Sequence, residues 1–468
     1  MLFNSYEFIF CYLPIVFCGY FVLAKYRYTK VATVFLMVAS LSFYAYWDIH
    51  YLPLLLLSII FNYRIGCYIE RYRKKILLAI GIGVNFLLLG YFKYTVFLLV
   101  SLNDILQTEF IVPNIVLPLG ISFFTFTQTA YLIDAYRGET KGYSFWTYGL
   151  FVTIFPHLIA GPIIYHRDMI PQFSRLRNFV INYRNIAIGL TFFSIGLFKK
   201  TIIADGIAPW ANYAFSHVAG LSFFEAWVGT IAYMLQLYFD FSGYSEMAIG
   251  LGLLFNFKFP INFYSPYKAL SFIDFWRRWH ITFSTYLRNY LYIPLGGNRR
   301  GKIRQFSNIF LTFLLGGLWH GAGWNYILWG CMHGVFIMIN HLWKSYGRPF
   351  SPIISWNLTF WTLSLTMVMF RAANVSDGIH MIKTMLQVTT IFPSGTYGIA
   401  LGRLQFGNEF TVFILLGLMI FILWSKSVPE LMKQFQPNLK WMVVTAILFL
   451  ISLLTMSGGV SEFLYFQF

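Results

Sequence analysis

The most constraining feature of the sequence is a series of apolar segments, each about as long as a lipid bilayer is thick. A transmembrane α-helix needs roughly 20 predominantly apolar residues, and these runs are too continuous for the strands of a membrane barrel. Only 11% of the residues are charged, whereas soluble domains carry about 25%. The sequence therefore predicts an all-α polytopic membrane protein, and excludes a soluble multidomain enzyme and a disordered chain. The first predicted spans are 6–24, 31–47, 52–69, 76–102 and 116–135.

The first connections between these spans alternate between connections rich in basic residues and connections that have none. Lys and Arg exceed Asp and Glu by 17 in the whole chain, and in a membrane protein such an excess first encodes orientation. Connections 25–30 and 71–75 are rich in Lys and Arg, whereas 47–51 and 101–114 contain none. By the positive-inside rule, the N-terminus is expected outside and the basic connections in the cytoplasm. Because no cation precedes Lys25, the first segment reads as a retained span rather than a cleaved signal peptide.

The segment 145–165 departs from this alternation, because cations flank it on both sides. It contains Pro156, Gly161 and Pro162, which predict a re-entrant or sharply bent element that returns to the cytoplasmic side. Non-helical backbone at membrane depth survives only against protein or around water, so this element is a candidate wall of an internal chamber. The later predicted spans give about twelve crossings and an outer C-terminus; they are 186–206, 223–255, 306–319, 326–343, 355–370, 410–424 and 441–456. We predict one membrane domain over residues 1–468, richest in motifs over 116–343.

The densest cationic stretch of the chain lies between the spans that end near residue 255 and begin near residue 306. Because the stretch 258–305 is also rich in aromatic residues and proline, we expect it to be embedded in the cytoplasmic leaflet rather than to form a free loop. Orientation and the binding of lipid headgroups are sufficient reasons for such cations.

Ionisable groups inside apolar segments are costly, so each one is a functional candidate. Asp240 and Glu246 lie in segment 223–255. The simpler interpretation of Asp240 is a buried acid paired with an Arg of the cationic stretch. His157, in the bent segment, is interpreted as a cap of that element.

The strongest candidates for catalysis in the sequence are three histidines, His280, His320 and His333. His320 lies deep in an apolar segment, directly after Trp319 and next to glycines that let a substrate approach closely. A buried neutral imidazole can take a proton from a hydroxyl group, which is general-base catalysis. A hydrogen-bonded packing histidine and a haem ligand are the alternatives that the residues alone leave open.

Other chemistries find little support in the sequence. It contains no GxSxG, HExxH, Walker or kinase signature. The four cysteines form no CxxC pair and no metal-ligand spacing, so no metal site is expected. A transporter or channel remains the alternative from another functional class, although no inverted repeat with paired broken helices favours it.

Several motifs are spread over most of the chain: PLGISFFTF, AYLIDAYRG, FPHLIAGPI, LYFDFSGYS, FWRRWHITFSTYLRNYLYIPLGGNR, LGGLWHGAGWNYILWG and the final YFQF. Together they resemble the membrane-bound O-acyltransferase (MBOAT) superfamily, in particular its bacterial branch typified by the alginate O-acetyltransferase membrane subunit. Asn289 departs from this branch, which has Asp in LRDYLYIPLGG, so no carboxylate role is expected at that position.

The resemblance implies roles for individual residues. His320 resembles the nearly invariant catalytic histidine, His280 the second histidine, which orients substrate, and His333 a further histidine of the family. Supporting roles are expected for Trp319, Asn325 and Asp240. Five cations of the cationic stretch could bind the phosphates of coenzyme A: Arg277, Arg278, Arg299, Arg300 and Lys302. Membrane orientation and the binding of lipid headgroups are an equally weighted alternative for these cations.

The resemblance also implies a fold and an activity. The fold is a ring of about 11–12 tilted transmembrane helices, with re-entrant or interfacial helices around a central tunnel. The activity is transfer of acetyl from cytoplasmic acetyl-CoA, a substrate and not a resident cofactor, across the bacterial inner membrane. The acceptor is an exported polysaccharide such as alginate, cellulose or peptidoglycan, and His320 either activates its hydroxyl or itself holds the acetyl group.

Partners and alternatives complete these expectations. An extracytoplasmic SGNH-type hydrolase-like protein is the expected partner, with the surface 372–408 and the C-terminal FLYFQF as docking points; no nucleic acid is expected. The runner-up enzyme activity is D-alanyl transfer to teichoic acid from a carrier-protein thioester.

Overall fold

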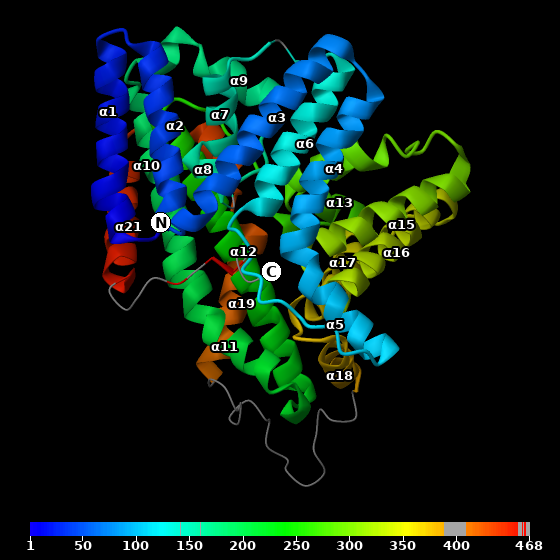
Figure 1. The fold of residues 1–468 in the computed structure, drawn as a ribbon. Coiled ribbons are helices and arrows are strands. Elements are labelled where there is room, and N and C mark those ends of the chain that lie inside the picture. Colours follow the sequence, from blue (N-terminus) through cyan, green and yellow to red (C-terminus); the bar gives the residue numbers. More distant parts are fainter. Residues whose placement is uncertain (141, 160, 388–408, 457–460, 462, 465–468) are drawn as a thin grey trace. The chain divides into compact units, whose positions relative to one another are not determined.

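The structure is a computed structural model that describes residues 1–140, 142–159, 161–387, 409–456, 461 and 463–464. The described part consists of helices and connecting segments, with no strand (Figure 1). Most of the predicted docking surface 372–408 and the chain end from residue 465 lie outside these residues.

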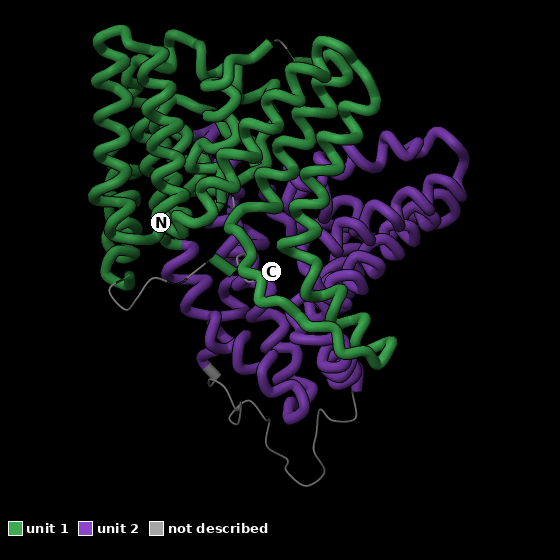
Figure 2. Tube along the Cα trace, viewed as in Figure 1, with its two compact units in different colours: residues 1–198, 244–261, 435–466 green, residues 199–243, 262–434, 467–468 purple. Residues whose placement is uncertain are grey.

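The helices divide between two compact units (Figure 2). Unit 1 comprises Met1–Phe198, Tyr244–Ile261 and the described part of 435–466, and unit 2 comprises Lys199–Gly243 and the described part of 262–434. The helices of unit 1 are α1 (Leu13–Lys25), α2 (Thr29–Ala45), α3 (Leu52–Tyr72), α4 (Lys75–Leu89), α5 (Thr95–Leu106), α6 (Ile121–Arg137), α7 (Phe145–Thr153), α8 (Phe155–Leu158), α9 (His166–Phe173), α10 (Tyr183–Phe198) and α21 (Leu439–Met456). Helix α12 (Phe223–Leu254) contributes to both units.

Besides its part of α12, unit 2 contains one helix before the cationic stretch, two short helices within it, and further helices from residue 301 onward. They are α11 (Asp205–Ser216), α13 (Phe272–Trp276), α14 (Ile281–Leu287), α15 (Gly301–His320), α16 (Trp324–Tyr346), α17 (Pro352–Arg371), α18 (Val375–Leu386), α19 (Glu409–Trp424) and α20 (Val428–Gln434). Short π-helical segments at Glu7–Tyr12, Gly90–Tyr94, Lys199–Ala204 and Arg288–Tyr292 join or extend several helices. Turns of 3-10 helix lie at Ile49–Tyr51, Leu176–Phe179, Val218–Gly220 and Pro266–Lys268.

Six helices of the described part are long and apolar enough to cross a membrane, and α19 with α20, bent by 47°, makes a seventh if the pair is one span. These six are Glu7–Lys25, Ile49–Tyr72, Lys75–Leu106, Tyr183–Ser216, Pro352–Arg371 and Leu439–Met456. The sequence-based count of about twelve is higher, because it includes helices that do not meet this condition, such as the 17-residue α2. The predicted span 186–206 also ends too early, since its helix continues through a π-helical segment to Ser216.

The predicted bend in segment 145–165 is present at Ile154, which leaves the helical conformation with ψ 116° between α7 and α8. His157 stabilises it: its Nδ1 lies 2.7 Å from the carbonyl oxygen of Pro162, and its Nε2 lies 3.3 Å from Thr127 Oγ1. Because a carbonyl only accepts, Nδ1 carries the proton. His157 therefore ties the chain after the bend to the bend itself, as the capping interpretation requires.

Candidate active site

The hairpin of α15 and α16 carries two of the three histidines that sequence analysis selects. The two helices pack closely because small residues face each other: a Cβ atom on Gly317 would collide with the carbonyl of Tyr326, and one on Gly330 with the carbonyl of Phe313. Small residues at such contacts let helix backbones approach. His320 is the last residue of α15, and His333 lies on α16.

The environment of His320 fixes which ring nitrogen can act as a base. The ring is 4% exposed, and its Nδ1 lies 2.6 Å from the carbonyl oxygen of Gly316. A carbonyl oxygen only accepts a hydrogen bond, so Nδ1 carries the proton of the neutral ring and Nε2 carries the basic lone pair. Aromatic rings surround the imidazole, with centroids 4.9–5.6 Å from its own; they belong to Phe283, Trp319, Trp329 and Phe370.

His280 lies beside His320, with the two ring centroids 6.5 Å apart. Its Nδ1 is 3.1 Å from Asn262 Oδ1, which also accepts bonds from the backbone N–H and the hydroxyl of Thr282 at 3.2 and 2.9 Å. The obligate donor at Thr282 identifies that amide atom as oxygen, so His280 donates through Nδ1 and its lone pair is on Nε2.

The backbone of His280 is in the left-handed region, with φ 43°. A non-glycine residue rarely adopts this conformation, and such residues cluster at active sites, where the surrounding structure holds them in place. The contacts with Asn262 before it and with the start of α14 after it supply that restraint.

His333 has the opposite tautomer. The indole Nε1–H of Trp276 donates to its Nδ1 at 3.1 Å, and an indole nitrogen can only donate, so the proton of the neutral His333 ring is on Nε2. The Nε2 of His333 and the Nε1 of Trp329 are buried and have no hydrogen-bond partner among the described residues. Because residues four apart share one face of a helix, α16 places two unused N–H donors close to each other. The ring of Trp329 contacts both His320 and His333, at centroid distances of 4.9 and 4.6 Å.

The predicted supporting residues have structural partners near the histidines. Trp319 stacks on Phe283 at 4.6 Å between centroids. Asn325 donates from Nδ2 to the carbonyl of Ala372 at 3.0 Å, which joins the start of α16 to the end of α17. Both residues therefore hold the walls around His320 in place.

Asp240 is buried as expected, but the predicted Arg partner is wrong. The Nζ of Lys200 lies 2.7 Å from Asp240 Oδ1 and 2.8 Å from Asp205 Oδ1. Lys200 is in the π-helical segment before α11, and its side chain and that of Asp240 are 4% and 2% exposed. A buried acid takes the cation that the fold places within reach, and here the preceding span supplies it. The neighbouring Phe241 packs on the ring of His280 at 4.8 Å, so this ion pair anchors the helix that borders the site.

The five predicted donor-binding cations fall into two groups. Arg277 and Arg278 follow Trp276, whose indole contacts His333, and Arg278 pairs with Asp274 at 2.9 Å. Arg299, Arg300 and Lys302 lie at the start of α15, with Lys302 bonded to the hydroxyl of Tyr346 at 3.0 Å. At 1.5 Å per residue, α15 separates this second group from His320 by about 30 Å.

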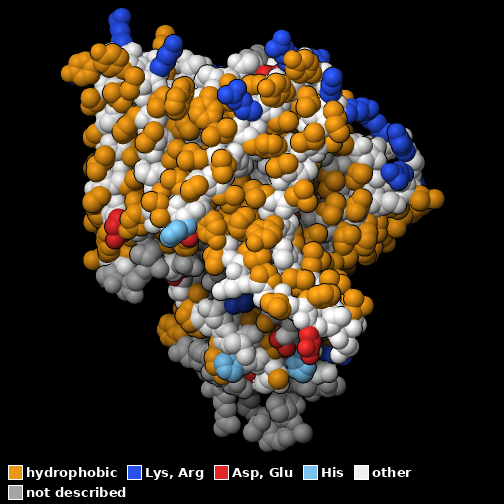
Figure 3. All heavy atoms as spheres, in the orientation of Figure 1, with side chains coloured by type: hydrophobic (Ala, Val, Ile, Leu, Met, Phe, Trp, Pro, Cys, Tyr) orange, Lys and Arg blue, Asp and Glu red, His pale blue; other side chains and the backbone are white. Residues whose placement is uncertain are grey.

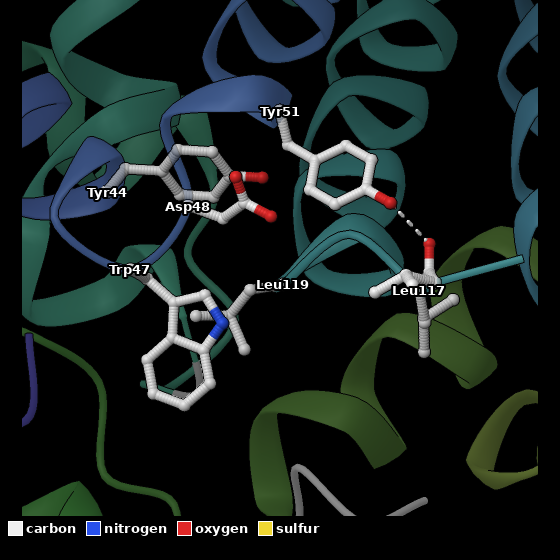
Figure 4. Close-up of a pocket in the computed structure, with 7 residues that line it drawn as sticks. Tyr44, Trp47, Asp48, Tyr51, Leu117 and Leu119 are labelled. Atoms are coloured by element: carbon white, nitrogen blue, oxygen red, sulfur yellow. Dashed lines mark hydrogen bonds between the residues drawn. The ribbon is translucent and has the colours of Figure 1, made fainter.

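A small cavity of about 30 Å³ lies in unit 1, away from all of these residues in the sequence (Figure 4). Its wall includes Tyr44, Trp47, Asp48 and Tyr51, and Tyr51 donates to the carbonyl of Val116 at 2.8 Å. The pKa of the Asp48 carboxyl is lowered, chiefly because the backbone N–H of His50 donates to it. This volume suits a single water molecule rather than a substrate.

No sequence pattern indicates a role for Asn262, Trp276 or Lys200, although they fix the states of His280, His333 and Asp240. Trp276 lies within the motif FWRRWHITFSTYLRNYLYIPLGGNR, but nothing in its spacing indicates that it bonds a histidine 57 residues later. A second buried set, in which His166 bridges the hydroxyl of Tyr143 and the carboxylate of Asp134 at 3.0 Å each, was also missed.

Comparisons with known proteins concern the chain as a whole. The family model described as MBOAT, membrane-bound O-acyltransferase family, matches residues 17–375. The chain is 46% identical over 420 residues to the peptidoglycan O-acetyltransferase of Helicobacter pylori, covering 82% of this chain and 80% of that one. It is 41% identical over 428 residues to a probable alginate O-acetylase of Pseudomonas aeruginosa, covering 89% and 81%. A teichoic acid D-alanyltransferase of Streptococcus thermophilus is 28% identical over 238 residues, covering 48% and 57%.

Proposed function

Because the chain belongs to the membrane-bound O-acyltransferase family, we propose that it transfers acetyl groups from cytoplasmic acetyl-CoA to hydroxyls of an exported polysaccharide, with His320 as the base. The observation that carries this proposal is the bond from His320 Nδ1 to the Gly316 carbonyl. Because Nδ1 is bonded to the backbone of its own helix, the basic nitrogen of the buried imidazole is Nε2. The aromatic rings around the imidazole exclude water from it.

The proposed reaction needs a base, a positioned hydroxyl and donors for the acyl oxygen. His320 Nε2 takes the proton of the acceptor hydroxyl, and the oxygen attacks the carbonyl carbon of the acetyl thioester. The carbon–sulfur bond then breaks, and the coenzyme A thiolate takes the proton from the imidazolium. His280, with its lone pair on Nε2, accepts a hydrogen bond from the acceptor and orients it.

The negative charge that develops on the acyl oxygen needs hydrogen-bond donors in a dry site. The unused N–H groups of His333 and Trp329 support this role, because they are buried beside His320 without an acceptor among the described residues. His333 thus serves as a donor and not as a second base in this proposal.

We expect His333→Asn to lower kcat by about 10²- to 10³-fold, the cost of one such donor. His333→Gln should retain more activity, because its longer amide reaches the position of Nε2 whereas that of Asn stays near Nδ1. Acetylation kinetics on purified protein test this, with thermal unfolding as a check on folding. Equal loss in both variants, with KM rather than kcat changed, would contradict a donor role.

The proposed orientation places the basic connections in the cytoplasm and the acceptor on the outer face of the inner membrane. The turns between α1 and α2 and between α3 and α4 lie at one end of unit 1, and Lys and Arg side chains gather there above a broad hydrophobic band (Figures 1 and 3). This arrangement supports an outer N-terminus and a cytoplasmic route for the acyl donor. An extracytoplasmic SGNH-type partner, implied by the family resemblance, is proposed to work with the enzyme on the outer face.

The cations at the start of α15 are proposed to bind the phosphates of acetyl-CoA, which needs no permanently bound cofactor. Arg299→Glu with Arg300→Glu should raise the KM for acetyl-CoA at least ten-fold, since charge-assisted bonds contribute about 1.5–3 kcal/mol each. Arg348→Glu is the matched control, because Arg348 is also exposed and follows α16, whose end Lys302 contacts. If only membrane orientation changes in the double variant, as measured by protease accessibility, these cations serve topology instead.

The overall function is tested by measuring the acetate and the D-alanine that are ester-linked to the cell-envelope glycans. Cells that lack this chain should lose acetate from an exported polysaccharide and regain it when the chain is supplied. Loss of D-alanine esters with unchanged acetate would favour the teichoic acid reaction, for which the weaker similarity to D-alanyltransferases is the supporting observation.

A further inference from the structure

Two apolar helices of unit 1, α10 and α21, lie side by side and form a groove between them (Figure 1). One wall of the groove is α10 between Ala187 and Ser194, and the other is formed by residues from Phe435 to Phe449, in α21 and the segment before it. Its volume is about 440 Å³, and small-molecule sites occupy roughly 300–1,000 Å³. Both helices belong to spans that are long and apolar enough to cross a membrane, so the groove lies at the depth of the bilayer.

The hydroxyl groups in the middle of this groove are bonded within the protein. The hydroxyl of Thr191 donates to the carbonyl of Ala187 at 2.8 Å, so at its 3.0 Å contact with Thr445 the Thr445 hydroxyl is the donor. Large apolar side chains line the groove beside this pair, and those of Leu190 and Met442 are 47% and 62% exposed. These walls suit the hydrocarbon chain of a lipid better than a sugar or a nucleotide.

The charges at one end of the groove are all positive. Arg184 shares a face of α10 with Ala187 and Thr191, three and seven residues later. It is exposed, and no ion pair between described residues includes it. The segments that lead into the two helices, 174–184 and 435–440, contain Arg and Lys but no Asp or Glu. Both helices begin at the end of unit 1 where Lys and Arg gather above the hydrophobic band (Figures 1 and 3).

We propose that this groove binds an acyl chain of an anionic phospholipid, whose phosphate is held by Arg184. Bilayer tails are as apolar as the groove, so the selectivity comes from the headgroup. Basic pockets between transmembrane helices bind anionic headgroups, and a zwitterionic lipid would bring its own cation to a site that is already positive. Only 11% of the most apolar window of α21 is buried within the protein, so the lipid adds contacts that hold this last helix against α10. The proposal does not depend on acetyl transfer.

Native mass spectrometry of the purified chain in detergent tests the proposal. Phosphatidylglycerol and phosphatidylcholine with the same acyl chains are titrated separately, and the wild type should bind one phosphatidylglycerol with the higher affinity. Arg184→Gln should lower that affinity by about 10- to 100-fold, the loss of one charge-assisted bond, and remove the preference. Lys440→Gln is the matched control, because Lys440 is exposed but its neighbours on the helix face, Val443 and Val444, do not line the groove. It should lower the affinity by no more than about five-fold, the effect of one surface cation.

A second pair of variants tests the groove itself. Ala446→Trp fills the groove and should abolish tight binding of phosphatidylglycerol, whereas Val443→Trp, on an exposed part of α21 outside the groove, should not. If Ala446→Trp does not fold, as judged by thermal unfolding without added lipid, the comparison of Arg184→Gln with Lys440→Gln still decides. Equal affinity of the wild type for the two lipids, or a preference that persists in Arg184→Gln, would overturn the proposal. So would a dimer that Ala446→Trp dissociates, because a second copy of the chain would then occupy the groove.

Discussion

Cells that carry His320→Ala at the normal protein level are expected to lose glycan-linked acetate by about 10²- to 10⁴-fold in initial rate, which is the range that general-base catalysis supplies. The loss follows from the geometry of one ring. The Gly316 carbonyl holds the proton on Nδ1, so Nε2 is the nitrogen available to accept the proton of the attacking hydroxyl. Acetate released from the isolated glycan by mild base measures the effect.

The control for this variant is another histidine of the same unit. His380→Ala removes an exposed imidazole on α18 and should leave acetylation unchanged. Thermal unfolding of both purified variants shows whether His320→Ala has kept its fold. Normal acetate levels in His320→Ala cells would refute the role of this residue as the base.

Lys200→Met is expected to have the largest effect on stability. Lys200 lies between the carboxylates of Asp205 and Asp240, at 2.8 and 2.7 Å, and its side chain is 4% exposed. Removing one partner of a buried pair leaves the other charge uncompensated, which destabilises proteins by about 3–5 kcal/mol. The expected result is a large fall in the temperature of unfolding in detergent, and a low protein level in the membrane.

A second substitution identifies the cause of that effect. Lys200→Met combined with Asp240→Asn should recover a good part of the lost stability, because the buried charge left by the first change is then removed. Lys199→Met is the matched control, since Lys199 is adjacent but only half-buried. A Lys200→Met protein as stable as the wild type would show that the ion pair does not anchor α12.

The sequence predicts the helices of this protein better than the pairings between them. Apolar length alone locates α15 and α17, expected at 306–319 and 355–370 and found at Gly301–His320 and Pro352–Arg371. Both windows start too late: α15 begins with a polar first turn at Gly301, and α17 already begins at Pro352. Within the described part, six or seven helices are long and apolar enough to cross a membrane, and shorter helices such as α2 contribute to the difference from the expected twelve.

The states of the site residues depend on contacts that no local pattern contains. Asp240 is assigned to an Arg from sequence because the densest cations follow it, whereas the fold supplies Lys200 from the preceding span. The tautomers of His280 and His333 are set by Asn262 and Trp276, which become neighbours only through folding. Motif resemblance selects the three histidines, whereas the folded structure shows that His280 and His320 carry their proton on Nδ1 and His333 carries it on Nε2.

The most direct test of the central claim is transfer across a sealed membrane. The purified chain is reconstituted into vesicles with a saccharide acceptor sealed inside, and labelled acetyl-CoA is supplied outside only. We expect labelled acetyl ester on the trapped saccharide with the wild-type chain and none above background with His320→Ala. Equal labelling by the two proteins, or labelling only when donor and acceptor share one compartment, would contradict transfer across the membrane with His320 as the base.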